Sequence, residues 1–255
     1  IGSSIFSFLY RVIKTIFKKN IYLIIAISPY TFLTFLLLTI LRKKTYVYLM
    51  SNGYEEYEYI LGKNFKWIYG FMFKIITKFS IVIVCHSRLF DPKKSHEITP
   101  SRLNDNWIKN WNLPNLDKPR LLYVGRINPE KGIDNFINLY NKMNTNSELF
   151  IAGNTEKLTG TDHKIKSLGY ISSEQELIRT YDHCNITILP SYTEAHPYVL
   201  EESLSRKRPV IIFEDIAYVK KNKKGVYIIK RDSHEVKEQI DWILKNYQSI
   251  QKEMD

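Results

Sequence analysis

Two segments of the sequence place charged side chains directly after a strand-like apolar run. In the first, GRINPEKG at 125–132 follows RLLYV and carries Arg126 and Lys131 five positions apart. An arginine offers a planar fork of donors and a lysine offers a point charge, so this pair could clamp a diphosphate. Considered alone, the segment is equally compatible with a solvated turn that carries an Arg–Glu surface pair.

The second segment, SYTEAHPYVLEE at 191–202, follows NITILP and contains two spaced carboxylates. Glu194 lies in the turn, Pro197 lies where a helix can begin, and Glu202 comes eight residues after Glu194. This spacing puts one carboxylate before a helix N-terminus and the other about a turn and a half inside the helix. Backbone N–H groups of 195–198 would point at a phosphate bound there. The alternative is that Glu194 caps the helix and Glu202 lies on a solvated face.

The elements around both segments alternate between strands and helices. The predicted strands are 120–124, 148–152, 167–171, 186–189, 209–213 and 226–229. The predicted helices are 133–143, 173–181, 197–205 and one that begins near Ser233. Repeated strand–helix units give an α/β fold in which a parallel sheet has helices on both faces, and ligands bind beyond the carboxyl ends of its strands. Both charged segments are therefore expected at that edge.

The first part of the chain is apolar and aromatic, with strand-like runs at 45–50 and 79–85 and a helical stretch at 54–77. Segment 21–41 holds 21 residues without a charge between basic flanks, which is long enough for a transmembrane helix. Ser28-Pro29 near its centre would break such a helix. We favour a strand, a loop and a helix over a membrane span, and both remain open here.

Charge is distributed unevenly along the 255 residues. The chain has 37 Lys and Arg against 26 Asp and Glu, and 1–112 carries +10 of the excess whereas 113–255 carries +1. The change coincides with a polar, Pro-bearing stretch at 91–119, which predicts two domains, 1–112 and 113–255. A cationic first domain suits an anionic partner such as a membrane surface or a phosphate-bearing substrate. No nucleic-acid recognition motif is present, so we expect no nucleic acid partner.

Neither cysteines nor histidines have the spacing of a metal site. Cys85 and Cys184 lie a hundred positions apart in apolar runs, and the six histidines are scattered. Both cysteines are expected to be buried thiols of a protein from a reducing compartment, and no metal or cofactor is expected.

Taken together, GRINPEKGID and LPSYTEAHPYVLEESLSRKRPVI resemble the donor-binding half of glycosyltransferase family 4, the glycosyltransferase group 1 enzymes. The resemblance runs in order from about 120 to 229 and includes SLGYISSEQELIRTYDHCNITILPS. It implies the GT-B architecture, with two Rossmann-like domains. The first part is similar to the later strands of the family's acceptor domain, so an incomplete N-terminal domain is implied.

The resemblance also implies roles for individual residues. Arg126 and Lys131 would bind the donor pyrophosphate and stabilise charge on the leaving nucleotide in place of a metal ion. Glu194 would contact the donor sugar near the reacting centre, and Glu202 would accept hydrogen bonds from the ribose hydroxyls. The other implied donor-binding residues are Gly125, Ala195, His196, Pro197, Tyr198 and Val199, together with Gly169, Tyr170 and Ile171, which would line the base.

The implied reaction is a retaining transfer of a sugar from a nucleotide diphosphate sugar to an acceptor hydroxyl. The acceptor would be a saccharide or a lipid-linked molecule in surface glycan or lipid-linked saccharide synthesis. The protein would work in the cytoplasm, bound peripherally to the anionic inner face of the membrane. The alternative is a non-catalytic membrane-associated or scaffold protein that retains a nucleotide-sugar-binding domain.

Two departures from the family pattern bear on loop geometry. Ala195 stands where the family usually has glycine, and Ser205-Arg206-Lys207-Arg208 replaces a small-residue triplet before Pro-Val. Alanine permits the same close approach only if its φ is negative.

Overall fold

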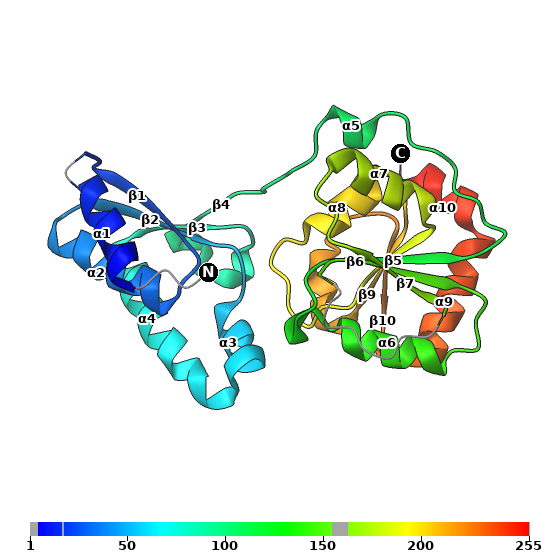
Figure 1. The fold of residues 1–255 in the computed structure, drawn as a ribbon, viewed down its shortest axis with the longest axis horizontal. Helices are drawn as coiled ribbons and strands as arrows, with labels where there is room; N and C mark the ends of the chain where they lie inside the picture. Colours follow the sequence, from blue (N-terminus) through cyan, green and yellow to red (C-terminus); the bar gives the residue numbers. More distant parts are fainter. Residues whose placement is uncertain (1–4, 17, 155–162, 255) are drawn as a thin grey trace. The chain divides into compact units, whose positions relative to one another are not determined.

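The chain folds into two compact units, Ile1–Pro100 and Ser101–Asp255, each built on a sheet of parallel strands (Figure 1). The computed structural model describes residues 5–16, 18–154 and 163–254. The α/β fold with a parallel sheet that the alternating pattern predicts is confirmed for the second unit, and the first unit contains a second parallel sheet.

The first unit contains a four-stranded parallel sheet in the order β1-β2-β3-β4. Its strands are β1 (Ile21–Ile25), β2 (Lys44–Leu49), β3 (Ile81–Val84) and β4 (Ser95–Glu97). Its helices are α1 (Ile5–Ile16), α2 (Pro29–Ile40), α3 (Gly53–Leu61) and α4 (Lys66–Phe79). Val47 of β2, Phe35 of α2 and Ile76 of α4 belong to one buried cluster, which places these helices on the same face of the sheet.

The apolar segment 21–41 folds as a strand, a turn and a helix. Ala26 turns the chain after β1 with a φ of 63°. The side chain of Ser28 then accepts a hydrogen bond from the Thr31 amide at 3.3 Å, and Thr31 Oγ1 accepts one from the Ser28 amide at 2.8 Å. This reciprocal cap starts α2, with Pro29 in its first turn. Among the described residues, no helix is long and apolar enough to cross a bilayer.

The helix expected over 54–77 is two helices rather than one. Gly62 has a φ of 93°, which ends α3, and a short 3₁₀ turn (Lys63–Phe65) leads into α4. Glycine adopts a positive φ of this size readily because it has no Cβ, so the chain can leave the helix here.

The second unit has a six-stranded parallel sheet in the order β10-β9-β8-β5-β6-β7. The strands are β5 (Arg120–Val124), β6 (Glu148–Ala152), β7 (Ile165–Gly169), β8 (Ile186–Leu189), β9 (Val210–Phe213) and β10 (Val226–Ile229). The helices are α5 (Asp105–Ile108), α6 (Ile133–Lys142), α7 (Glu174–His183), α8 (Tyr198–Ser205), α9 (Ser233–Lys245) and α10 (Tyr247–Glu253). This is the strand order of a Rossmann fold, and it reverses between β5 and β8.

Helices cover both faces of this sheet, as predicted. On one face α6, α9 and α10 supply Phe136, Ile240 and Ile250 to a large buried cluster. On the other, α8 contributes Leu200 and α7 contributes Tyr181 to two smaller ones. Strand β7 begins two residues earlier than expected, so 170–171 lie in the loop that follows it.

Both cysteines are buried thiols that form no disulfide, as the sequence predicts. Burial raises the pKa of the Cys184 thiol to about 12. A thiol so far from ionisation is an inert packing group.

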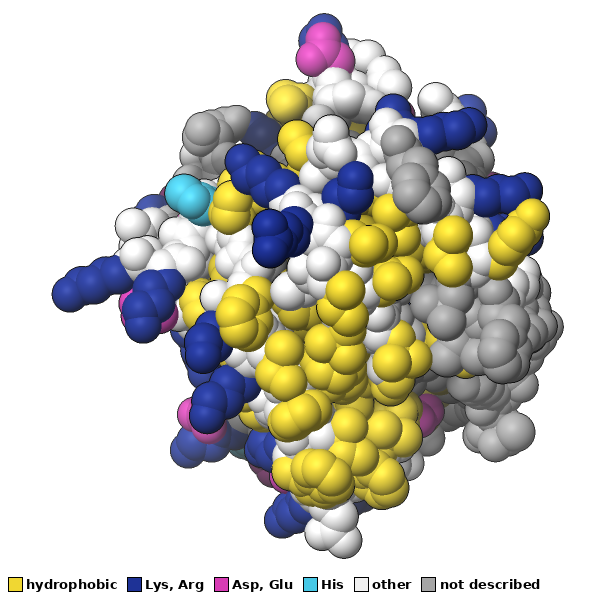
Figure 2. Space-filling view, turned by 90° about the vertical axis from the view of Figure 1, so that its left-hand side faces the viewer, with side chains coloured by type: hydrophobic (Ala, Val, Ile, Leu, Met, Phe, Trp, Pro, Cys, Tyr) yellow, Lys and Arg dark blue, Asp and Glu magenta, His cyan; other side chains and the backbone are white. Residues whose placement is uncertain are grey.

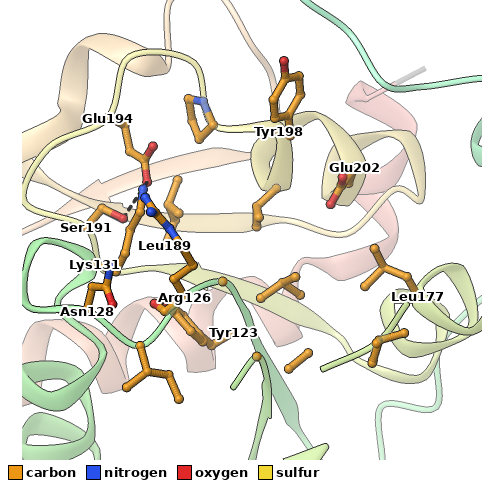
Figure 3. A pocket seen from close by; sticks show the side chains of 18 of the residues that line it. Tyr123, Arg126, Asn128, Lys131, Leu177, Leu189, Ser191, Glu194, Tyr198 and Glu202 are labelled. Carbon is orange, nitrogen blue, oxygen red and sulfur yellow. Dashed lines mark hydrogen bonds and ion pairs between the residues drawn. The ribbon is translucent and has the colours of Figure 1, made fainter. Parts of the chain in front are cut away.

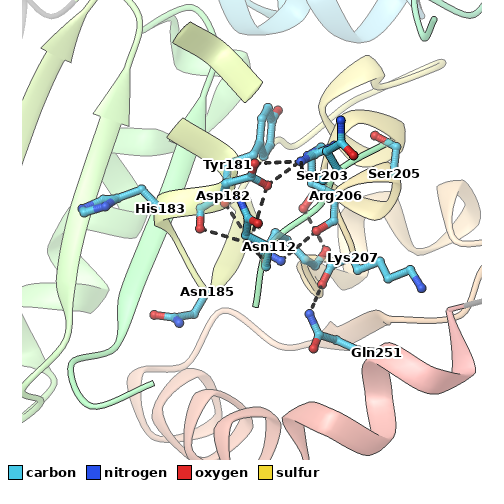
Figure 4. Close-up of polar contacts among 12 residues, drawn as sticks. Asn112, Tyr181, Asp182, His183, Asn185, Ser203, Ser205, Arg206, Lys207 and Gln251 are labelled. Atoms are coloured by element: carbon cyan, nitrogen blue, oxygen red, sulfur yellow. Dashed lines mark hydrogen bonds and ion pairs between the residues drawn. The ribbon is translucent and has the colours of Figure 1, made fainter. Parts of the chain in front are cut away.

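The second unit begins at Ser101, twelve residues before the boundary predicted at 112/113. The segment from Ser101 to Asn112 belongs to the second unit because two buried arginines, Arg206 and Arg208, bind part of it (Figure 4). Arg206 donates to the carbonyls of Trp107 (2.9 Å), Lys109 (2.8 Å) and Asn110 (3.0 Å). Arg208 donates to that of Asn112 at 2.6 Å. We call residues 105–112 the strap, because these bonds hold it against the second unit.

Candidate functional site

A cavity of about 640 Å³ lies at the carboxyl ends of β5 and β8, where the strand order of the second unit reverses. All of the sequence-predicted donor residues line it except Gly169, the last residue of β7, and Ala195, which is buried. Those in its wall are Gly125, Arg126, Lys131, Tyr170, Ile171, Glu194, His196, Pro197, Tyr198, Val199 and Glu202. Figure 3 shows Lys131 and Glu194 on one side of the cavity and Glu202 on the other.

The loop after β5 is pressed against the loop after β8. Gly132 has a φ of 66°, and a Cβ built there would lie 2.1 Å from the Pro190 carbonyl oxygen. Only glycine fits such a position. The Tyr192 amide also donates to the Glu130 carbonyl at 3.0 Å. These close approaches bring Lys131, which comes just before Gly132, to the loop that carries Glu194.

Lys131 and Glu194 form a direct ion pair across the two loops. Lys131 Nζ lies 2.6 Å from Glu194 Oε1, and the Ser191 hydroxyl donates to the same oxygen at 2.7 Å. The side chains are only 18% and 11% exposed, so water screens the pair weakly. The Tyr218 hydroxyl accepts from the Glu194 amide at 3.2 Å and fixes the main chain. Glu194 is therefore a partner of Lys131 and not the cap of α8.

Helix α8 begins beside this pair without a side-chain cap. Its N-cap residue is Pro197, and no side-chain hydrogen bond closes its first turn. The first amides of the helix thus remain available to an anion. Nearby, His196 Nε2 lies 3.3 Å from Glu201 Oε1, and the His196 ring packs edge-on against Tyr198 with centroids 5.6 Å apart.

Arg126 extends at the cavity wall with 69% of its side chain exposed. Its Nη2 is 3.7 Å from Glu130 Oε1, which also accepts a bond from Asn128 Nδ2 at 3.0 Å. Glu130 is not a surface residue, because only 2% of it is exposed. The Tyr123 hydroxyl donates to the Arg126 carbonyl at 2.6 Å and holds the backbone of the turn. Arg126 therefore has a fixed main chain and a long, exposed side chain that can reach an anion.

Glu202 is buried on α8, with 8% of the residue exposed, and does not lie on a solvated face. The Tyr181 hydroxyl donates to its Oε2 at 2.8 Å. Burial raises the pKa of Glu202, while the bond from Tyr181 and the charge of Arg102 act in the opposite direction. A buried carboxylate in a cavity wall is suited to accept hydrogen bonds from hydroxyl groups.

Comparison with known proteins decides the family. The model of the glycosyl transferases group 1 matches residues 105–255. The chain belongs to this family. An uncharacterized glycosyltransferase of Methanocaldococcus jannaschii is 23% identical over 145 residues, which are 51% of this chain and 37% of that protein. The chain thus spans well under half the length of this curated relative.

Solved glycosyltransferase structures share the fold along nearly the whole chain. Sucrose-phosphate synthase from Thermosynechococcus elongatus superposes with a TM-score of 0.72 at 17% identity, covering 95% of this chain and 68% of that one. HepE from Anabaena, in complex with UDP-glucose, gives a TM-score of 0.72 at 11% identity, covering 96% and 74%. At these identities the likeness shows the fold, which is the GT-B fold predicted from the sequence.

The two departures from the glycosyltransferase group 1 pattern have physical explanations. Ala195 is not among the described residues with positive φ, so it occupies the turn without left-handed strain. At the end of α8, Lys207 has a φ of 52°, and the Arg208 amide donates to the Ser203 carbonyl at 2.9 Å. This is the Schellman end of a helix, which usually contains glycine. It turns both flanking arginines inward to bind the strap.

Sequence reasoning missed three residues that line the cavity or contact its wall. Arg102 lines the cavity, with its guanidinium carbon 4.5 Å from the centre of the Tyr198 ring, yet it sits in a stretch that looked like a linker. In the sequence, nothing distinguishes Tyr181 from an ordinary buried aromatic residue of a helix. Ser191 carried a readable signal, because it directly follows a predicted strand beside Glu194. Among the described residues, no group of three or more His, Cys, Asp or Glu could hold a metal ion.

Proposed function

We propose that the chain transfers a sugar from a nucleoside diphosphate sugar to an acceptor hydroxyl, with donor binding in the second unit and acceptor binding in the first. The observation that carries this proposal is the Lys131–Glu194 pair beside the uncapped start of α8, at the point where the strand order reverses. A group 1 glycosyltransferase needs an anion site and a carboxylate there. The HepE structure of the same fold is a complex with UDP-glucose, which supports a nucleotide sugar as donor.

The cations and the helix would hold the donor diphosphate. Lys131 is a point charge, Arg126 is a long fork that extends toward the same part of the cavity (Figure 3), and the α8 amides point along the helix axis. As the bond to the sugar breaks, negative charge grows on the diphosphate, and these groups stabilise that charge. Arg126 and Lys131 thus supply positive charge, so the proposal requires no resident metal or cofactor.

The transfer would retain the anomeric configuration. The bond from the anomeric carbon to the phosphate oxygen breaks, and the bond to the acceptor oxygen forms on the same face of the sugar. The acceptor hydroxyl proton passes to the departing phosphate, so that no protein base is consumed. Glu194, held by Lys131 and Ser191, contacts the sugar beside the reacting carbon. Glu202 accepts hydrogen bonds from the ribose hydroxyls on the opposite side.

The decisive experiment measures transfer of radiolabelled sugar from UDP-, ADP- and GDP-glucose by the full chain. Glu194→Gln keeps the size of the side chain and is expected to lower turnover at least about 100-fold, as loss of one charge-stabilising group does. Glu238→Gln, an exposed carboxylate on α9, is the matched control and should be unaffected. Undiminished turnover in Glu194→Gln refutes the site. Nucleotide binding by the wild-type chain without transfer to any acceptor would support the non-catalytic alternative.

The first unit has a surface suited to an anionic membrane, which fits synthesis of a surface glycan or a lipid-linked saccharide at the inner face of the membrane. Figure 2 shows apolar side chains gathered on one face with Lys and Arg around them. In β1, Ile21, Leu23 and Ile25 are 63%, 56% and 54% exposed, and Lys44 is the register partner of Ile21. Apolar surface edged by cations binds anionic headgroups and the acyl boundary together.

Sedimentation with lipid vesicles tests this peripheral attachment. The chain should bind vesicles of phosphatidylglycerol and phosphatidylcholine, and high salt should release part of it because the attraction of surface charges is screened. Vesicles of pure phosphatidylcholine should bind it far less. Equal binding to both vesicle types, or none, contradicts the membrane assignment and leaves the donor site untouched.

A further inference from the structure

Tyr181 is a fully buried side chain whose only polar atom contacts the donor cavity's carboxylate. It lies on α7 with 0% exposure, and its hydroxyl donates to Glu202 Oε2 at 2.8 Å. Among the described residues, this is the hydrogen bond that the Glu202 carboxylate accepts. Glu202 lines the cavity, whereas Tyr181 does not. The tyrosine thus lies behind the carboxylate as seen from a ligand.

The position of Tyr181 is set by rigid surroundings. Its ring meets that of Trp107 edge-on with centroids 5.6 Å apart, and Trp107 belongs to the strap held by Arg206. Leu122 of the central strand β5 and Cys184 lie in the same buried cluster. The hydroxyl fixed in this way binds Oε2 of Glu202. The other carboxylate oxygen, Oε1, is therefore the one presented to a ligand.

The same bond affects the charge of Glu202. Burial raises the pKa of this carboxyl group, and the hydrogen bond from Tyr181 stabilises the ionised form. The facing charged groups are Arg102, which favours ionisation, and Glu201, which opposes it. An ionised carboxylate accepts bonds from both hydroxyls of a ribose, whereas a protonated one loses an acceptor site and becomes a donor.

We propose that Tyr181 is a positioning residue for donor binding: by donating to Oε2 it orients Glu202 and favours its ionised form, so that this carboxylate can hold the ribose hydroxyls of the nucleotide. The inference rests on the proposed function, because it assumes a nucleotide in this cavity. It adds a buried tyrosine and, through Trp107, the strap to the parts that determine nucleotide affinity.

The experiment measures nucleotide affinity by calorimetry, without requiring an acceptor or turnover. UDP, ADP and GDP are titrated into the full chain, and the tightest of them is compared with its 2′,3′-dideoxy counterpart from pH 5.5 to 8.5. We divide the dissociation constant of the dideoxy form by that of the ribonucleotide. A larger ratio means that the ribose hydroxyls contribute more to binding. Ionised Glu202 should give a higher ratio than protonated Glu202, so any change of the ratio with pH in the wild type should be a rise.

Tyr181→Phe keeps the ring against Trp107 and removes only the hydroxyl. The rise of the ratio should move to higher pH, and near neutral pH the ribonucleotide should bind about tenfold more weakly, because Glu202 is then less well oriented and less ionised. Glu202→Gln should bind weakly at all pH values, and adding Tyr181→Phe to it should change nothing further. Tyr247→Phe is the control: it also removes a buried hydroxyl, which donates to the Asn185 carbonyl at 2.6 Å, and neither residue lines the cavity. It should leave the pH profile unchanged.

The outcomes separate this inference from the proposed function. If Tyr181→Phe lowers the melting temperature but leaves the pH profile as it is in the wild type, the tyrosine is only a packing residue and the inference is wrong. A further loss in the double variant overturns it as well, since Tyr181 would then act elsewhere. Wild-type binding of nucleotides without discrimination against the dideoxy form refutes the ribose role alone. If no nucleotide binds, the proposed function fails and the inference fails with it.

Discussion

Replacing Arg206 by methionine should detach the strap from the second unit. Methionine preserves length and apolar packing but removes four hydrogen bonds, to the carbonyls of Asn106, Trp107, Lys109 and Asn110. It also removes the paired bonds to Asp182, at 2.9 Å from Nε and 2.7 Å from Nη2. Asp182 is 15% exposed and would keep Arg208 at 3.6 Å as its remaining cation.

The expected cost follows from these contacts. Removing one partner of a buried ion pair costs about 3–5 kcal/mol, because the other charge stays buried without compensation. Arg208 offsets part of this for Asp182, whereas the freed carbonyls add to it, so we expect about 3–5 kcal/mol in all. A chain of this size loses roughly 2–4 °C of melting temperature per kcal/mol, which gives a fall of about 10 °C.

Hydrogen exchange of the strap amides, read by mass spectrometry, measures this loss locally. Protection of 105–112 should fall more than protection of the β5 and β8 strands. Lys237→Met is the control, since it breaks an exposed pair with Asp241 of 2.7 Å and should cost less than about 0.5 kcal/mol. Arg206→Lys should not rescue protection, because a single ammonium cannot bond the strap carbonyls and both Asp182 oxygens at once as the guanidinium does. A loss below about 1 kcal/mol in Arg206→Met would refute the reasoning.

Two further predictions concern stability. Lys166 at 2.6 Å and Lys118 at 2.9 Å lower the pKa of Glu148 to about 2, from 4.5. Between pH 2 and pH 4.5 the native state therefore binds fewer protons than the unfolded state. The contribution of Glu148 to the free energy of unfolding is fully present above pH 4.5 and is lost as the pH falls toward 2. Glu148→Gln should thus be less stable than the wild type in urea at neutral pH, with the difference vanishing near pH 2; a pH-independent difference would contradict it. Gly132→Ala should cost more than Gly169→Ala in the same assay, because φ is 66° and 67° respectively but only the Cβ at 132 meets a carbonyl oxygen, at 2.1 Å. Equal losses of unfolding free energy in the two variants would contradict this prediction, because they would mean that the loop at Pro190 moves aside without cost.

The local sequence pattern was sufficient to predict the strands of the second unit and the edge of the sheet at which the charged segments meet. Its strands are short continuous apolar runs, and the charged segments follow two of them, so the meeting of Lys131 and Glu194 follows from sheet topology. Local pattern failed where partners are distant in sequence. Arg206 binds carbonyls almost a hundred residues earlier, and these contacts, not composition, set the domain boundary.

The roles of single carboxylates also depended on distant partners. A carboxylate just before a helix can interact with its first amides, but Glu194 pairs instead with Lys131, 63 positions earlier. A helix carboxylate is usually solvated, but Glu202 is covered by Tyr181 from another helix. In the first unit, Gly62 ended a helix that apolar periodicity alone extended.

The central claim is that the cavity binds a nucleoside diphosphate sugar through Lys131. Calorimetric titration of UDP-, ADP- and GDP-glucose into the full chain and into Lys131→Met tests it most directly, with Lys237→Met as the control. We predict that at least one donor binds the wild type and that Lys131→Met binds it roughly 10- to 100-fold more weakly, because a charged hydrogen bond is lost and Glu194 faces the diphosphate unpaired. Unchanged affinity in Lys131→Met would contradict the account.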